Sequence, residues 1–390
     1  MNKKVRDYLI ILFITLVVFL VYFLRSSHVP FLGIDSYYFL NHIFYGSDLF
    51  VTGFFGTFII NLLPANIFII KLIMFFITLL TLFIAYKCAE LYENKYALIY
   101  PLSLLAFISF SLVFFKFEDD IFSLPFLFGS LYFIIRYQLS SKLNKIFNKN
   151  IILSVLFLGI SILIWKYTVL FILVYLFLTN FHYIYILLSS VFIIFYKSFL
   201  FTILPNNLIA ENSMAFISGN IAGGIIILLF FLFLKKSMIR ENRLAIYLFS
   251  VLTLLNYKLI YILTPILLLN NIKLLKNISL DKHKVIYFIW FLFLIGTINQ
   301  IVISPPSYSD YKLIGVTQSL ETQLEKDTIY NWGYGYFAIW NKIDTNYFGS
   351  TPIDKISYKN HLVVIEKNNP LVSNCEKIEK GKWFELVNCP

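Results

Sequence analysis

The chain contains 390 residues, of which 59% are hydrophobic and 14% are charged, and its mean hydropathy is +0.79. Ordinary soluble domains carry roughly 25% charged residues. The composition therefore excludes a soluble globular protein, a disordered chain, a coiled coil and a disulfide-rich secreted scaffold, and it predicts a polytopic α-helical membrane protein. The net charge of +11 does not indicate a nucleic-acid partner, because the basic residues lie in short loops beside apolar runs, where they set membrane topology.

Eleven apolar runs are interpreted as transmembrane helices, since a span needs roughly 20 apolar residues. In chain order they are 8–24, 66–86, 97–115, 121–138, 151–165, 167–180, 183–197, 218–234, 244–256, 259–272 and 285–303. A further short helix is expected at 53–63, lying at the membrane surface. Several runs are only about 14 residues long, so 151–180 and 244–272 could each form one long helix instead.

The distribution of basic residues predicts the orientation. With the N-terminus inside, eleven spans place 17 Lys and Arg residues in inner loops and 5 in outer loops. Merging either pair of short helices would move a Lys-rich loop outside, against the positive-inside rule. We therefore expect a multi-pass protein of the cell membrane with a cytoplasmic N-terminus and an extracytoplasmic C-terminus. The first apolar run lacks a small-residue cleavage site and is expected to be retained as a helix.

The composition changes near Ser304, where the segment Ser304-Pro305-Pro306-Ser307 would break a helix. Residues 1–303 hold 23 Lys and Arg against 11 Asp and Glu, whereas residues 304–390 hold 9 against 10. This shift predicts two domains, a transmembrane domain at 1–303 and a small extracytoplasmic α/β domain at 304–390.

The C-terminal domain is expected to contain strands at 328–330, 361–365 and 383–387, with a helix near 336–342. Cys375 and Cys389 both fall in this domain, and an oxidising compartment would allow them to form a disulfide. The alternative is two reduced cysteines that happen to lie 14 residues apart.

Carboxylates mark the outer side of this topology. The expected outer loops hold Asp35, Asp48, Glu118, Asp119, Asp120 and Glu211. Adjacent carboxylates repel each other unless a cation lies nearby, and hard divalent cations prefer such oxygen ligands. A shared site is therefore predicted. The alternative is that Asp35 and Asp120 cap helices while Glu211 is an ordinary surface charge.

Four short motifs lie on this outer side, namely Asp35-Ser36-Tyr37-Tyr38, Phe117-Glu118-Asp119-Asp120-Ile121, Ile209-Ala210-Glu211-Asn212 and Asn331-Trp332-Gly333-Tyr334-Gly335. The first three resemble the acidic loop motifs of the GT-C superfamily of membrane glycosyltransferases. The closer resemblance is to the catalytic subunit of oligosaccharyltransferase. The fourth is similar to that subunit's Trp-Trp-Asp-Tyr-Gly signature.

This resemblance implies a GT-C fold and transfer of a sugar or oligosaccharide from a polyprenyl-phosphate-linked donor to a protein or glycolipid acceptor, at the outer face of the lipid bilayer. It implies catalytic roles for Asp35, Glu118 and Asp120. Together with Glu211 these residues could hold Mg²⁺ or Mn²⁺, which would neutralise the leaving phosphate. In a reaction without metal, Asp35 would act as general base on the acceptor.

Substrate contacts are expected from Lys166, Glu211, Trp332 and Tyr334. Lys166 could neutralise donor phosphate, or it could simply extend to the lipid headgroups. Trp332 and Tyr334 could contact the acceptor, or they could belong to a structural turn. Gly333 stands where the family signature has its acceptor-recognising Asp, so the expected acceptor differs from the usual Asn-x-Ser/Thr sequence.

Two other functions fit parts of the sequence. One is a transporter or flippase of lipid-linked intermediates, but such proteins usually show internal repeats and polar sites at the membrane midplane, and neither is found. The other is a non-catalytic GT-C-fold subunit of a glycan-assembly complex. Lys71 and His42 are further polar residues near this side, for which structural roles are the simpler interpretation.

Overall fold

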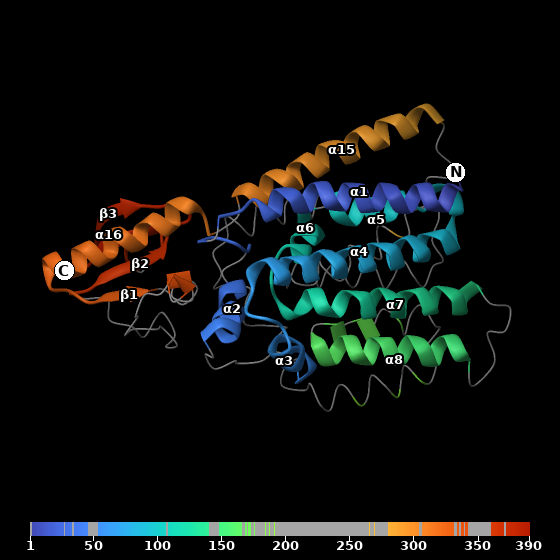
Figure 1. The fold of residues 1–390 in the computed structure, drawn as a ribbon, viewed down its shortest axis with the longest axis horizontal. Coiled ribbons are helices and arrows are strands. Elements are labelled where there is room, and N and C mark those ends of the chain that lie inside the picture. Colours follow the sequence, from blue (N-terminus) through green and yellow to red (C-terminus); the bar gives the residue numbers. More distant parts are fainter. Residues whose placement is uncertain are drawn as a thin grey trace.

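The computed structural model describes most of the N-terminal half and most of the C-terminal domain. The described residues are 2–26, 28–32, 35–45, 54–106, 108–139, 148–165, 168–169, 171–172, 175, 184, 187, 191, 265, 269, 280–303, 306–330, 334, 337–338, 340–341, 360–369 and 372–390. Within these ranges the chain is mostly helical, with a small sheet near the C-terminus (Figure 1).

Three of the described helices are long and apolar enough to cross a membrane: α1 (Lys3–Phe23), α4 (Ile67–Tyr92) and α7 (Asp119–Leu139). Shorter apolar helical segments occur in α8 (Lys149–Ile164) and in α15 (Leu280–Ile303). The chain is therefore a membrane protein. The expected spans at 218–234 and 244–256 lie outside the described residues.

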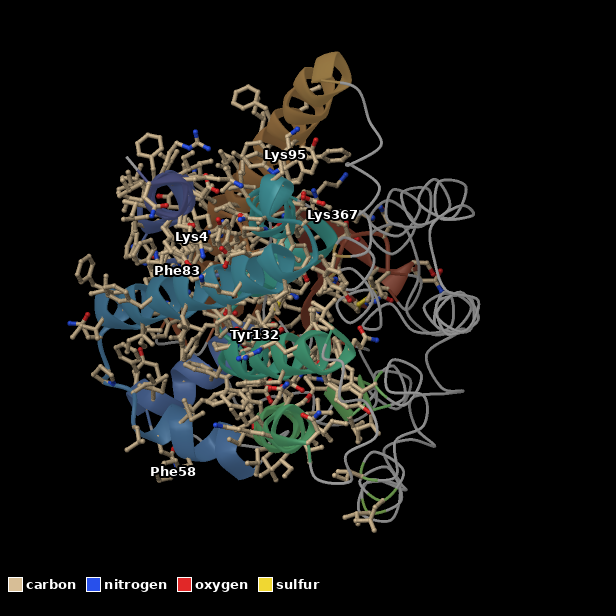
Figure 2. The ribbon with its side chains drawn as sticks, turned by 90° about the vertical axis from the view of Figure 1, so that its right-hand side faces the viewer. Lys4, Phe58, Phe83, Lys95, Tyr132 and Lys367 are labelled. Carbon is tan, nitrogen blue, oxygen red and sulfur yellow. A yellow bond between two sulfur atoms is a disulfide. The ribbon has the colours of Figure 1, made fainter. Side chains whose placement is uncertain are left out.

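The helices α1, α4, α7 and α8 lie side by side, with α4 between α1 and α7, and α7 between α4 and α8 (Figures 1 and 2). Small residues let α7 and α8 approach closely. Ser130 Oγ donates to the Ser154 carbonyl at 2.8 Å, and Ser154 Oγ donates to the Ser130 carbonyl at 2.9 Å. A side chain at Gly129 would collide with the ring of Phe157. Close packing therefore makes α7 the most buried of the three long helices.

The predicted continuous helix at 97–115 is wrong in detail. The chain instead forms α5 (Ile99–Ala106), the short α6 (Ile108–Ser111) and a 3₁₀ turn at Leu112–Phe114. Thr297 of α15 donates its hydroxyl to the Ala106 carbonyl at 2.7 Å. This hydrogen bond ties the end of α5 to α15.

The C-terminal domain contains a four-stranded sheet in the order β1-β2-β4-β3. β1 (Thr328–Tyr330) pairs parallel to β2 (Leu362–Glu366), and β4 (Phe384–Asn388) pairs antiparallel to both β2 and β3 (Glu376–Lys380). Three expected strands are thus confirmed. The helix α16 (Tyr308–Leu324) packs against β3 and β4.

Asp310 joins α16 to this sheet. Its Oδ2 accepts hydrogen bonds from the backbone and hydroxyl of Ser307, which close a capping box at the start of α16. Its Oδ1 accepts from the backbone N–H groups of Trp383 and Phe384 at 2.8 and 3.2 Å. Gly381 is required nearby, because a Cβ atom there would stand 2.4 Å from Oδ1 of Asp310.

The predicted disulfide between Cys375 and Cys389 is confirmed, with Cα atoms 4.4 Å apart. It joins the segment before β3 to the end of β4. A cross-link that closes a loop of this length stabilises a domain by about 3 kcal/mol in the chain-entropy estimate, which is a large share for a domain of this size.

The C-terminal domain docks on the segment that follows α1. Arg25 donates to the carbonyls of Val29 and Pro306 at 3.0 Å each and also to that of Ile301. The rings of His28 and Tyr311 stack with centroids 4.3 Å apart. In Figure 1 the N-terminus lies at the opposite end of the bundle from this domain. We call the two ends of the bundle the N-terminal end and the domain end.

The helix α2 (Asp35–Tyr45) contributes to the same contact. Its residue Phe44 packs edge-on against Trp340 at 5.1 Å, and the hydroxyl of Tyr45 donates to the Trp340 carbonyl at 3.2 Å. Because α2 begins at Asp35 and its last residues contact Trp340, the motif that begins at Asp35 lies at the domain end.

Candidate functional site

Three carboxylates gather where α7 begins at the domain end. Glu118 precedes the helix, and Asp119 and Asp120 are its first two residues. Both aspartates are 5% exposed. Carboxylates stabilise a helix N-terminus through its unpaired N–H groups and dipole, which explains why α7 begins here. Helix capping does not by itself require burial, however, and this burial distinguishes the cluster from ordinary surface charge.

The segment that follows α1 lies directly against this cluster. Leu32 forms a parallel β-bridge with Lys116, and Ser36 Oγ accepts a hydrogen bond from the backbone N–H of Phe117 at 2.9 Å. Ser36 also donates to the Leu32 carbonyl at 2.5 Å, which fixes its hydroxyl. Asp35 is the first residue of α2 and the immediate neighbour of Ser36. Two of the four acidic and aromatic motifs are therefore adjacent in space, although they are about 80 residues apart in sequence.

Lys116 supplies positive charge to the cluster. Its Nζ lies 3.7 Å from a carboxylate oxygen of Glu118, and both side chains are partly buried. Partial burial strengthens such a pair relative to one on the open surface.

The short helix α3 (Phe54–Asn61), expected at 53–63, borders the acidic cluster on another side. A Cβ atom at Gly56 would stand 3.1 Å from the Ile164 carbonyl and 3.4 Å from Cβ of Asp119. Glycine therefore allows α3 to approach both the end of α8 and the start of α7. This contact was not expected from the sequence, because a single glycine in an apolar run does not identify its distant neighbours.

Asp120 is one of the buried carboxylates of the described cluster. Its Oδ1 is buried and has no hydrogen-bond partner among the described residues. Burying a charged oxygen in this way costs several kcal/mol unless a proton, a cation or a donor is beside it. The local chemistry of Asp120 is therefore suited to receiving a proton or to binding a cation.

The predicted metal ligands are Asp35, Glu118, Asp120 and Glu211. Among the described side chains, no group of three or more His, Cys, Asp or Glu is arranged to hold a metal ion. The side chains of Asp35 and Glu211 lie outside the described set. The oxygen donors of Glu118 and the buried Oδ1 of Asp120 fit a hard divalent cation in chemistry.

Of the four predicted substrate-binding residues, the structure describes only Tyr334. Lys166, Glu211 and Trp332 lie outside the described residues. Tyr334 is fully buried in the C-terminal domain, where its hydroxyl donates to the Asp310 carbonyl. Burial raises the pKa of this phenol, since the ionised form would lose its hydration. The packing favours the structural alternative for Tyr334.

Two other polar residues near this end have structural partners. Lys71 is buried inside α4, donates to the Tyr22 carbonyl at 3.1 Å and lies 4.8 Å from the centroid of the Tyr22 ring. His42 Nε2 lies 2.6 Å from Oδ1 of Asn61, which links α2 to α3. These contacts fit the structural roles expected from the sequence.

Comparison with known proteins leaves the site without a close relative: no protein-family model matches the chain, and no curated protein is significantly similar to it.

Proposed function

We propose that this protein is a membrane glycosyltransferase of GT-C type that transfers a sugar or oligosaccharide from a polyprenyl-phosphate-linked donor to a protein or glycolipid acceptor. One observation carries the proposal. The hydrogen bond from Phe117 to Ser36 at 2.9 Å brings the Asp35 motif beside the buried carboxylates at the start of α7. A membrane-boundary site of this kind could receive a donor whose lipid remains in the bilayer.

The proposed reaction breaks the bond between the anomeric carbon and the donor phosphate oxygen and forms a bond from that carbon to a nucleophilic acceptor atom. In a reaction without metal, Asp35 would take the proton that the acceptor loses. The departing phosphate retains the bonding electrons, so it needs positive charge nearby. A divalent cation, where bound, would supply that charge from ligands among Glu118, Asp120, Asp35 and Glu211.

The proposal includes the topology of eleven spans, with the N-terminus cytoplasmic and the C-terminal domain extracytoplasmic. The separation of the N-terminus and the C-terminal domain to opposite ends of the bundle supports it (Figure 1). An alkaline phosphatase fused after residue 390 should be active, because this enzyme requires an extracytoplasmic location. An inactive phosphatase, together with an active cytosolic reporter at the same position, would contradict this orientation.

The central experiment is a transfer assay on membranes that contain the full chain, using radiolabelled polyprenyl-phosphate-linked sugars with and without EDTA. Wild type should form labelled product, and Asp35→Ala should abolish it while the folded protein remains at wild-type level. Asp327→Asn is a matched control, because Asp327 is an exposed carboxylate of the C-terminal domain. Full activity of Asp35→Ala would disprove the proposed base.

A further inference from the structure

The exposed side of α16 contains a pocket that is separate from the acidic cluster. Its volume is about 350 Å³, which is within the range of small-molecule sites. Its lining residues are Tyr311, Lys312, Ile314, Gly315, Gln318 and Asn341. Five of these six belong to α16, and Asn341 forms the opposite wall.

Gly315 is the residue that leaves this pocket open. It lies in the interior of a 17-residue helix, where glycine is among the least favourable residues. A Cβ atom at this position would meet nothing within 4 Å. Close packing therefore does not explain the glycine, in contrast to Gly381 and Gly129, where a side chain would collide with its neighbours. The absence of a side chain at Gly315 leaves space between Tyr311 and Gln318.

The described lining residues of the pocket combine one aromatic ring with two amides. The ring of Tyr311 is held in place by stacking on His28. The amide of Asn341 is held by a hydrogen bond from its Nδ2 to the Phe337 carbonyl at 3.0 Å. Amide groups offer both donors and acceptors. Lys312 lies at the rim, with its ammonium group 5.5 Å from the ring of Tyr308.

This lining offers the hydrogen-bonding groups that a carbohydrate requires. Sugar hydroxyl groups donate and accept hydrogen bonds, as amides do. The C–H face of a sugar ring packs against an aromatic ring, and Tyr311 supplies one beside the space that Gly315 leaves. We propose that the pocket binds one or two sugar rings of the glycan on which the enzyme acts. This inference rests on the proposed function but concerns binding rather than transfer.

The test measures sugar binding directly, on the full chain in lipid nanodiscs, by saturation-transfer NMR. The probes are the free disaccharides of N-acetylglucosamine, glucose and mannose at millimolar concentration. At least one probe should show saturation transfer in wild type. Gly315→Leu should weaken that signal at least tenfold, because leucine would occupy the pocket.

Gly159→Leu is the matched control, because Gly159 is also a helix-interior glycine with nothing within 4 Å of a Cβ atom. It should bind like wild type. A melting temperature of Gly315→Leu no lower than that of wild type shows that the fold is intact. The proposal is overturned if no disaccharide binds to wild type, or if Gly315→Leu binds as well as wild type does.

Binding and transfer can fail separately. Asp35→Ala should lose transfer and still bind the disaccharide, whereas sugar binding by a protein that never transfers would reject the proposed enzyme and keep the pocket. Adding unlabelled polyprenyl-linked donor then identifies the source of the sugar: displacement of the probe assigns the pocket to the donor glycan, and its retention assigns the pocket to the acceptor.

Discussion

The N-terminal end and the domain end of the bundle both bury carboxylates, but the groups around those carboxylates differ. At the N-terminal end, Glu90 pairs with Lys4 at 2.7 Å and with Lys87 at 2.9 Å. The buried Asp7 accepts a hydrogen bond from the hydroxyl of Tyr86 at 3.1 Å. These contacts join α1 to α4, so this end uses its carboxylates to hold helices together.

At the domain end, Glu118, Asp119 and Asp120 are consecutive, and a lysine lies 3.7 Å from Glu118. Oδ1 of Asp120 is buried without a hydrogen-bond partner among the described residues. Proteins retain such unfavourable arrangements chiefly where they serve chemistry. The partners therefore separate the carboxylates that join helices from those proposed to act in the reaction, since both sets are buried.

The largest expected effect is on catalysis at the domain end. Asp120→Asn should lower the rate of sugar transfer by at least about 100-fold, as loss of a group that transfers protons or stabilises charge does in other enzymes. Asp7→Ala should change the rate by less than about threefold, because a structural carboxylate affects stability first. Initial rates in the radiolabel assay measure both variants. Equal losses of transfer rate in the two variants would contradict different roles for the carboxylates at the two ends.

The second expected effect has the opposite pattern and concerns stability. Asp7→Ala should lower the free energy of unfolding by about 1–3 kcal/mol, because Tyr86 would lose its buried partner. Asp120→Asn should leave that free energy unchanged or raise it, since a poorly compensated buried charge is removed. Thermal unfolding in detergent measures the stability of both variants. A clear loss of stability in Asp120→Asn would assign Asp120 to the structural class.

A smaller effect is expected from a change in α3, the short helix that borders the site. Gly56→Ala would place a Cβ atom 3.1 Å from the Ile164 carbonyl and 3.4 Å from Cβ of Asp119. A shift of α3 should lower transfer by about tenfold, because small displacements near reacting groups are costly. Gly159→Ala serves as control. Unchanged transfer in Gly56→Ala would show that α3 can move without affecting the site.

The smallest effect is expected at Lys116. Its ion pair with Glu118 is partly exposed, and such pairs contribute less than about 1 kcal/mol. Lys116→Gln should therefore lower transfer by only about threefold. Measurements at low and high salt should show a smaller difference at high salt, where screening already weakens the pair. A loss above tenfold would instead indicate that Lys116 contacts the donor phosphate.

Sequence patterns predicted the long elements well, since apolar runs end where charged residues begin. The expected spans at 66–86 and 121–138 correspond to α4 and α7. The edge strand Glu376–Lys380 was missed, because its charged and fully exposed residues carry no apolar alternation. The helix α16 was missed for a related reason, since its sequence is mostly polar.

The candidate site was predictable only where its residues share a recognisable chemistry. Carboxylates in separate loops of a charge-poor chain indicated a common site, and the structure places the Asp35 motif beside Phe117. The roles of Ser36 and Gly56 depend on contacts between distant segments, which no local pattern encodes. The burial of Tyr334 could not be read from its turn-like sequence, because it results from packing against α16 and β4.

The three carbonyl partners of Arg25 have a mechanical consequence. The guanidinium joins the loop after α1, the end of α15 and the start of the C-terminal domain through Val29, Ile301 and Pro306. Any swing of the domain about its linker would break bonds on at least one side of this clamp. These bonds hold the domain in one position relative to the helices. A ligand bound to the domain would therefore keep a constant distance from the carboxylates at the start of α7.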